Sequence, residues 1–492
     1  MFDNIVFGYQ SIIFIYALAI TIIYIALSCF GYYNIARTKL KYTDREEELL
    51  NSQPYRIPGI SVVAGAYNEE VVIIDNVTSF LNLDYPKFQV VIVNDGSTDR
   101  TLEILIENFE LKEVPFPYVE KIYCRPVKRI FKSVNPKFKH LTVVDKINGG
   151  TKADAMNAGI NVAEYDYIIN TDMDCILAPD TLKKVIIPVL DSKVPVIAVG
   201  ATMRMANGCE VENGVITRIG PPAEFITTFQ ETEYLRSYLV AKMGWSLLNA
   251  IPNISGGFGL FDKSVIINVG GFDPLSHAED MDITLRIGAY MRRQNQKYRI
   301  IQIPDSCCWT EGPTNLKVLH RQRSRWGRGL LQIFVKHRRL LFNKKYGKLG
   351  FTITPYALFF EFLAPILEAL GLISIIYLLA TSQINFNTFW LMLSFVFMTG
   401  VTISLLTILF DIWVKKVYQK KVEYLKLLLF SLFEAFFYHP FVVVFTLHGY
   451  WKFLTSRKRK WGEMTRRGYT KKTEIVSPDL VKEIVNSSSG SN

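Results

Sequence analysis

Apolar and polar residues are distributed very unevenly along this chain of 492 residues. Residues 4–36 and residues 369–410 contain no Asp, Glu, Lys or Arg. About 20 consecutive apolar residues suffice to cross a bilayer as a helix, so the first stretch predicts one membrane span. The second stretch is broken by polar residues and predicts two spans, over about 356–380 and 387–412.

A third apolar stretch, residues 425–454, is interrupted at His439 and Pro440 and is followed by the basic residues 457–472. Lysines and arginines favour the cytoplasmic side of a membrane. If this stretch crossed the bilayer, the basic tail would lie outside. We therefore expect a re-entrant or interfacial helix pair bent at Pro440, since irregular backbone is tolerated at membrane depth when protein buries it. Residues after Ser477 have a composition typical of a disordered terminus.

The central part of the chain alternates short apolar runs with polar, helix-like segments. Residues 60–66 and 89–93 predict buried strands, and residues 76–83, 99–108 and 154–163 predict helices. This alternation is typical of an α/β domain with a mostly parallel sheet flanked by helices. The predicted organisation is a first membrane helix with its linker, a cytoplasmic α/β domain, further membrane helices and a basic tail, over 1–45, 46–345, 346–456 and 457–492.

The composition narrows the classes of partner. With 49% hydrophobic and only 21% charged residues the chain is not broadly disordered. Its net charge of +11 predicts an anionic partner. Because the positive charge flanks the apolar stretches, membrane lipid explains it better than nucleic acid, which we do not expect as a partner. The six cysteines form no CxxC pair, which indicates reduced thiols rather than a disulfide framework or metal cage.

Five motifs carry candidate chemistry. In VVIVNDGSTDR, Asp95 ends a strand where a carboxylate can accept hydrogen bonds from a base or ribose. In GGTKADAMNAG, a glycine pair before a helix and Lys152 suit a phosphate. In IINTDMDC, Asp172 and Asp174 lie two apart on an extended strand and share one face, so both can reach one cation, Mg²⁺ or Mn²⁺. A strand–turn–helix connector and a flexible loop explain the first two motifs equally well.

The fourth motif is an acidic pair, and the fifth is a basic, tryptophan-containing segment. Glu279 and Asp280 precede an apolar helix, and either cap that helix or supply a catalytic carboxylate. In RQRSRWGRG, Arg325 can clamp a diphosphate and Trp326 offers a flat face to a sugar ring. A basic amphipathic helix at the membrane surface explains the same residues, and both interpretations can hold together.

In order and spacing, the series YNE, NDGSTD, GGTKADAMNAG, DxD, ED and QxxRW resembles the processive, membrane-embedded glycosyltransferase family 2. This family includes cellulose synthase catalytic subunits, hyaluronan synthases, chitin-synthase-like enzymes and poly-β-1,6-N-acetylglucosamine synthases. The resemblance covers about residues 58–345 and implies a GT-A type α/β domain at the cytoplasmic face of the cell membrane. Two departures are AED in place of TED, with Ala278, and one extra residue in the lysine motif.

The resemblance also implies roles for individual residues. Asp95 would contact the nucleotide base, and Lys152 would lie near the ribose and diphosphate. Asp172 and Asp174 would hold the donor diphosphate, Asp174 through the metal. Asp280 would be the general base, and the QxxRW residues would bind acceptor and diphosphate; these are Gln322, Arg325 and Trp326. No C-terminal module is long enough for a cyclic-dinucleotide-binding barrel, so regulation of that kind, or export, would need an accessory subunit.

The expected activity is therefore transfer of sugar from a nucleotide (UDP) sugar to a growing polysaccharide. One base and no evident carboxylate nucleophile favour a single displacement, and hence inversion to a β-linkage. The membrane helices would let the product cross the bilayer, and Glu361 and Glu368, seven apart on one helix face, would line its path; an interfacial helix start explains these glutamates as well. Two other classes remain open: non-processive transfer to a polyprenyl or other membrane lipid, and an inactive homologue serving as a membrane-anchored receptor or binding subunit.

Overall fold

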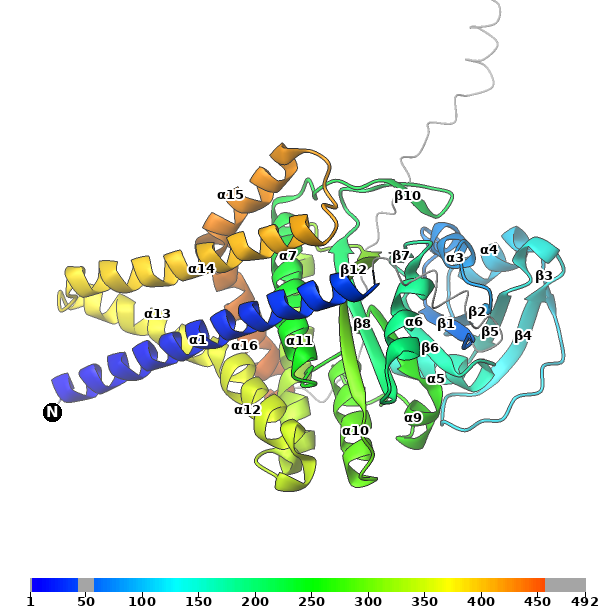
Figure 1. Cartoon of the computed structure of the whole chain (residues 1–492), viewed down its shortest axis with the longest axis horizontal. Helices are drawn as coiled ribbons and strands as arrows, with labels where there is room; N and C mark the ends of the chain where they lie inside the picture. The colour runs from blue at the N-terminus through cyan, green and yellow to red at the C-terminus, as the bar shows by residue number, and fades with distance from the viewer. Residues whose placement is uncertain (1, 43–56, 456–492) are drawn as a thin grey trace, which may run out of the picture.

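The computed structural model describes residues 2–42 and 57–455 (Figure 1). An α/β domain carries a group of long apolar helices that project together from one side of it. The predictions for the linker at residues 43–45 and for the basic, disordered tail at 457–492 concern residues outside this description.

A ten-stranded sheet forms the centre of the α/β domain within the described residues, in the order β3-β4-β5-β2-β1-β6-β11-β8-β12-β7. The strands β5, β2, β1 and β6 are mutually parallel, and so are β8 and β12. Strand β11 is antiparallel to both of its neighbours, so the sheet is more mixed than the alternating pattern predicts. The bounds are β1 Ile60–Ala66, β2 Phe88–Asn94, β3 Leu111–Glu113, β4 Val127–Ser133, β5 Leu141–Lys146, β6 Tyr167–Asp172, β7 Cys175–Leu177, β8 Val196–Met205, β11 Phe258–Asp262 and β12 Arg299–Thr310; β9 Glu210–Glu212 and β10 Val215–Arg218 form a separate hairpin.

Helices cover both faces of this sheet because its central strands are apolar on both faces. Val63 and Val93 pack with α5 in one core cluster, whereas Val62 and Ile92 pack with α3 in the other. The predicted α/β fold class is thereby confirmed. The helices of the domain are α3 Ile73–Leu81, α4 Thr101–Asn108, α5 Lys152–Val162, α6 Thr181–Asp191, α7 Phe225–Leu235, α8 Met243–Leu247, α9 Lys263–Asn268, α10 Glu279–Arg293 and α11 Leu316–His337.

Three helical segments among the described residues are long and apolar enough to cross a membrane: Ser11–Thr38, Leu349–Ala380 and Phe386–Val414. The first lies within α1 (Phe2–Tyr42), and the third is α14. The second starts about seven residues earlier than the sequence predicts, because π-helical turns and the short helix α12 (Thr354–Tyr356) lead directly into α13 (Ala364–Ala380). All three project in the same direction in Figure 1.

The apolar stretch over residues 425–454 is bent as predicted. Helices α15 (Lys421–Phe437) and α16 (His439–Thr455) meet at an angle of 51°. His439, at the bend, lies 2.8 Å from the Glu368 carboxylate of α13. Glu368 precedes the end of α13 at Ala380 by twelve residues, or roughly 18 Å at 1.5 Å per residue. The bend therefore stops well short of the far ends of the other apolar helices.

A buried charge cluster joins the sheet to the apolar helices. Arg204 of β8 is paired with Glu231 of α7 (3.1 Å) and with Asp411 near the end of α14. The hydroxyl of Tyr418 donates to Glu231 (2.6 Å), and that of Tyr424 donates to Asp411 (3.1 Å). All five side chains are buried, so α14 is held in a fixed position relative to the α/β domain.

Candidate functional site

The DxD carboxylates lie at the carboxyl end of the central parallel strands. Asp172 is the last residue of β6, and Asp174 follows in the turn between β6 and β7. One oxygen of each carboxylate and the Cys175 thiol lie within 4.8 Å of one another. The two aspartates are thus brought together as predicted, but by a turn rather than by a shared strand face.

Lys152 faces this acidic pair. The residue begins α5, and its Nζ donates hydrogen bonds to the Asp172 carboxylate and to the carbonyl oxygen of Gly256 (2.6 Å). Gly150, just upstream, has a φ of +72°, a left-handed conformation that glycine adopts easily. The glycine-rich loop therefore delivers an ammonium to the DxD motif, as a phosphate-binding role requires.

Asp95 does not contact the DxD carboxylates but binds the loop that precedes Lys152. Its Oδ1 accepts hydrogen bonds from Lys146 Nζ (2.5 Å) and from the backbone N–H of Gly149 (2.9 Å). Gly96 has a φ of +63°, and a Cβ there would lie 2.9 Å from the Asn148 backbone nitrogen. Asp95 thus fixes the start of the lysine loop, and the fully buried Lys146 is a partner that the sequence analysis missed.

Two glycines connect the DxD motif to the acidic pair of α10. The N–H of Gly256 donates to Asp280 Oδ2 (3.2 Å), while its carbonyl accepts from Lys152. A Cβ on Gly256 would lie 3.3 Å from Glu279 Oε1, and one on Gly257 would lie 3.3 Å from Asp172 Oδ2. Only glycine leaves the backbone this close to both carboxylate groups without displacing them.

Asp280 is half-buried and oriented from three sides. Besides Gly256, Asn253 Nδ2 donates to its Oδ2 (3.2 Å), and the N–H of Met281 donates to its Oδ1 (2.8 Å). Through the contact with Met281, Asp280 accepts from an N–H in the first turn of its own helix, whose N-cap Ala278 makes no side-chain cap, so a structural contribution and a catalytic role are compatible. Burial and the neighbouring charge of Asp280 raise the pKa of Glu279, although Lys152 and Arg325 oppose this rise.

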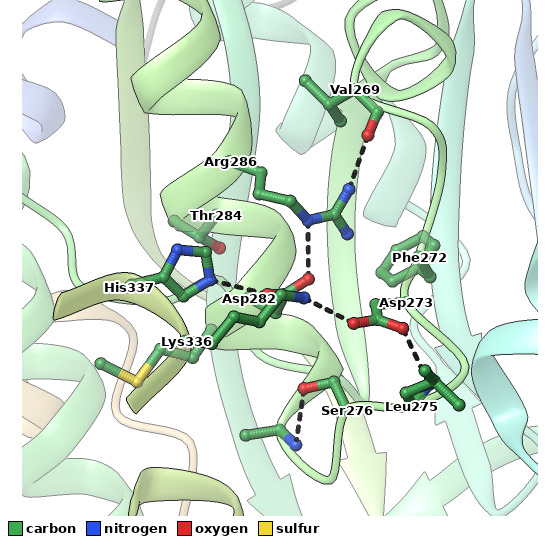
Figure 2. A network of polar contacts seen from close by, with 12 residues as sticks. Val269, Phe272, Asp273, Leu275, Ser276, Asp282, Thr284, Arg286, Lys336 and His337 are labelled. Carbon is green, nitrogen blue, oxygen red and sulfur yellow. Dashed lines mark hydrogen bonds and ion pairs between the residues drawn. The ribbon is translucent and has the colours of Figure 1, made fainter. Parts of the chain in front are cut away.

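A polar network around Asp282 holds α10 in place (Figure 2). Asp282, which is fully buried, accepts from His337 Nε2 (2.7 Å) and Arg286 Nε (2.6 Å), and pairs with Lys336 Nζ (2.6 Å). Burial alone would raise the pKa of Asp282, but these partners hold it well below its usual range. His337 and Lys336 belong to the end of α11, so this network fixes the two motif-bearing helices relative to each other.

The QxxRW residues lie on α11, so the segment is helical, as the alternative interpretation of a basic amphipathic helix requires. Gln322 is buried and accepts a hydrogen bond from Gln230 Nε2 (3.0 Å). Arg323, one of the two unspecified positions of the motif, lies with its guanidinium 4.5 Å from the centre of the Trp326 ring. The same guanidinium pairs with Glu233 and donates to Tyr438 Oη (2.7 Å). Arg323 therefore fixes Trp326, and the motif pattern alone gave no signal for this role.

One cavity of about 1400 Å³ brings these groups together. Its lining includes Lys152, Asp172, Asp174, Glu279, Asp280, Gln322, Arg325 and Trp326. Asp95 is not among the lining residues. The cavity continues between the apolar helices, where Tyr16, Tyr24, Glu361, Glu368 and His439 line it. Both glutamates thus line the same cavity as the catalytic motifs, which opens into the helix bundle, and their role along a product path stays a prediction.

The family follows from comparison with known sequences. Residues 58–329, more than half of the chain, match the family described as glycosyltransferase like family 2. This chain belongs to that family. Residues 217–447 also match the related glycosyl transferase family group 2, which extends the similarity through the apolar helices. The predicted family and the GT-A type fold are confirmed.

Among curated relatives, the poly-beta-1,6-N-acetyl-D-glucosamine synthase of Staphylococcus epidermidis is 28% identical over 291 residues. The enzyme of the same name from Staphylococcus aureus strain COL is 28% identical over 285 residues. The first match covers 58% of this chain and 58% of the relative; the second covers 57% and 56%. The chain thus matches little more than half the length of these relatives.

Solved structures with similar folds include the mannosyltransferase PcManGT from Pyrobaculum calidifontis in complex with GDP-Man and Mn²⁺. It is 19% identical with a TM-score of 0.47, and the match covers 89% of this chain and 99% of that one. S. aureus TarS 1-349 in complex with UDP-GlcNAc is also 19% identical, with a TM-score of 0.33 and coverage of 56% and 66%.

Proposed function

We propose that this protein is an inverting, processive glycosyltransferase that adds sugars from a UDP-sugar to a β-linked polysaccharide and moves the product into the membrane. The observation that carries this proposal is the single cavity shared by the catalytic motifs and the apolar helices. A transferase acting on a soluble acceptor has no need for an active site that opens between such helices. Similarity to the synthases named above supports a polymeric product.

In the proposed reaction, a hydroxyl of the acceptor attacks the anomeric carbon of the donor sugar. A new carbon–oxygen bond forms as the bond to the diphosphate breaks. Asp280 takes the hydroxyl proton, and its three hydrogen bonds keep the carboxylate aimed at one place. Because attack and departure occur on opposite faces of the sugar, an α-linked donor yields a β-linked product.

Positive charge on the donor side would stabilise the leaving diphosphate. Lys152 and Arg325 both line the cavity and are the side chains proposed to contact it. The oxygens of Asp172 and Asp174 are the hard ligands that Mg²⁺ or Mn²⁺ prefers, and their proximity fits a divalent ion. When bound, such an ion would neutralise diphosphate charge. Asp95 lies outside the cavity lining, and its proposed contact with the nucleotide base rests on the family resemblance alone.

The apolar helices give the expected product path. The cavity wall between them carries hydroxyl and carboxylate groups, including Tyr16, Tyr24, Glu361 and Glu368, that can exchange hydrogen bonds with sugar hydroxyls. We place the protein in the cell membrane with the α/β domain in the cytoplasm, because the basic residues after the first span lie on the domain side. An accessory export or regulatory subunit remains a prediction.

The test is to embed the purified chain in lipid nanodiscs and to supply a panel of nucleotide sugars with Mn²⁺ or Mg²⁺. We expect one UDP-sugar to release UDP and to give a polymer that lengthens with time. Incorporation of a single sugar into lipid would instead support non-processive transfer, and absence of UDP release from every donor would contradict the proposed activity.

A further inference from the structure

A buried lysine faces the cavity where its catalytic and membrane-facing parts meet. Lys242 ends the π-helical segment Arg236–Lys242, lines the cavity and is only 7% exposed. Over the described part of the chain, its ammonium donates no hydrogen bond and belongs to no ion pair. It rests over the ring of Tyr238, with Nζ 4.6 Å from the ring centre.

The side chain of Lys242 is largely buried, but its Nζ is not one of the fully buried polar atoms that lack a partner, so the ammonium reaches the open cavity, where a ligand can accept its hydrogen bond. Lys146, Lys152 and Lys184, which are equally buried, all pair with carboxylates. Lys242 differs from them because it faces open space in the cavity instead of an aspartate. We therefore expect a polar group of a bound substrate to accept a hydrogen bond from the Lys242 ammonium.

The charges around Lys242 indicate which substrate that is. Burial lowers the pKa of Lys242 to about 8, and the carboxylates that oppose this effect are Asp280 and Glu361. Asp280 is the proposed base for the acceptor hydroxyl, and Glu361 lies where the cavity enters the apolar helices. A phosphate beside these two carboxylates would be repelled, whereas a neutral sugar oxygen would not.

We propose that Lys242 is an acceptor-binding residue whose ammonium donates a hydrogen bond to a hydroxyl or amide carbonyl oxygen of the acceptor saccharide. This inference rests on the proposed function, since it assigns the acceptor to the membrane-facing part of the same cavity. In this proposal the positively charged side chains of the site have different partners: Lys152 and Arg325 bind the donor, and Lys242 binds the acceptor.

The first experiment measures binding of a soluble β-linked N-acetylglucosamine oligosaccharide to the full chain in nanodiscs with UDP present. Lys242→Met removes the donor but keeps a flexible side chain of similar length. A lost hydrogen bond to a charged group corresponds to about a tenfold to hundredfold weaker oligosaccharide affinity, and UDP affinity should stay unchanged. Lys242→Arg should keep most of the affinity. Lys112→Met, on the exposed edge strand β3, is the matched control and should behave as the unsubstituted protein does.

The second experiment needs no substitution and is therefore independent of whether a variant folds. A lysine with a pKa near 8 is more reactive toward amine reagents at neutral pH than an ordinary lysine. The oligosaccharide should protect Lys242 from modification, as read by mass spectrometry, and UDP alone should not. Protection by UDP alone, failure of the oligosaccharide to bind or to protect, or unchanged oligosaccharide affinity in Lys242→Met would each overturn the assignment. If oligosaccharide binding depends on Lys242 but no donor releases UDP, the proposed function fails and the binding site stands.

Discussion

At the scale of single residues, Asp280 and Arg325 are assigned to opposite partners of one reaction. Asp280 is oriented by Gly256, Asn253 and Met281, and we propose that it acts on the acceptor hydroxyl. We expect Asp280→Asn to lower turnover by about 10²–10⁴, the usual contribution of a general base, without changing UDP affinity. Turnover by UDP release and affinity by titration check this. Glu113→Gln, on the exposed edge of the sheet, is the control, and a variant of Asp280 that retains full turnover would show that this carboxylate only caps its helix.

Substitution of Arg325 is expected to have a different effect, because we propose that its charge acts on the departing diphosphate. Arg325→Ala should lower turnover and also weaken inhibition by UDP, by about tenfold to a hundredfold if one charge-assisted contact is lost. Arg325→Lys should restore part of this, since an ammonium lacks the two-pronged geometry of a guanidinium. If UDP binds Arg325→Ala as tightly as the unsubstituted protein, the diphosphate contact is misassigned.

The DxD motif gives a prediction about metal. Asp174→Asn removes one negative charge from the proposed cation site and should abolish turnover while thermal unfolding stays close to that of the unsubstituted protein. The same loss is expected when a chelator removes divalent cations, and added Mn²⁺ or Mg²⁺ should reverse it only in the unsubstituted protein. Full activity in excess chelator would exclude a metal at this site.

At the scale of elements, the network around Asp282 fixes α10 against α11 (Figure 2). Asp282→Asn keeps the size of the side chain but weakens its contacts with His337, Arg286 and Lys336. Charged hydrogen bonds contribute about 1.5–3 kcal/mol each, so we expect a clearly lower unfolding temperature at pH 7. Glu210→Gln, in an exposed pair with Arg218, is the control and should change little.

The pH dependence of this effect has a defined sign. The folded state holds the pKa of Asp282 below its unfolded value of about 3.9, so its stabilisation is fully present above that value. The stabilisation is lost as the pH falls through the folded pKa. The difference in unfolding temperature between Asp282→Asn and the unsubstituted protein should therefore be constant near neutrality and shrink below about pH 4. A difference that grows toward acid pH would contradict the assignment.

At the scale of the whole molecule, the bent pair α15–α16 decides the membrane topology. Gly327 of α11 approaches α16 so closely that a Cβ would lie 2.5 Å from the Thr446 carbonyl oxygen, and Lys426 of α15 donates to the carbonyl of Pro222 (2.5 Å). Both legs of the pair thus contact the α/β domain. Cysteines introduced one at a time at Lys420 and Lys452 should therefore be labelled from the cytoplasmic side, in a chain whose two accessible cysteines, Cys29 and Cys209, are replaced by Ser.

A cysteine at Gln383, between α13 and α14, is the control for the opposite side of the membrane. This cysteine should react with an impermeant thiol reagent from outside in intact cells. The cysteines introduced at Lys420 and Lys452 should react only after permeabilisation. Labelling of Lys452 from outside would mean that α15 and α16 cross the bilayer as one broken span.

Local sequence patterns were enough to predict the family, the α/β class, the apolar spans and the bend near Pro440. These features depend on local patterns, namely apolar runs of strand or span length and polar motifs at strand ends, which a chain carries before it folds. The motif residues were predicted for the same reason, and Lys152, Asp172, Asp174, Asp280, Gln322, Arg325 and Trp326 do line one cavity.

The way in which distant residues support one another is a property of the folded chain. The turn that joins Asp172 to Asp174, the approach of Gly256 to two carboxylates and the antiparallel insertion of β11 depend on contacts between segments far apart in the chain. Lys146, Arg323 and Lys242 look like ordinary basic residues in the sequence. Their burial, and hence the need for an aspartate, a glutamate or a ligand beside each charge, exists only once the sheet and the helices have packed around them.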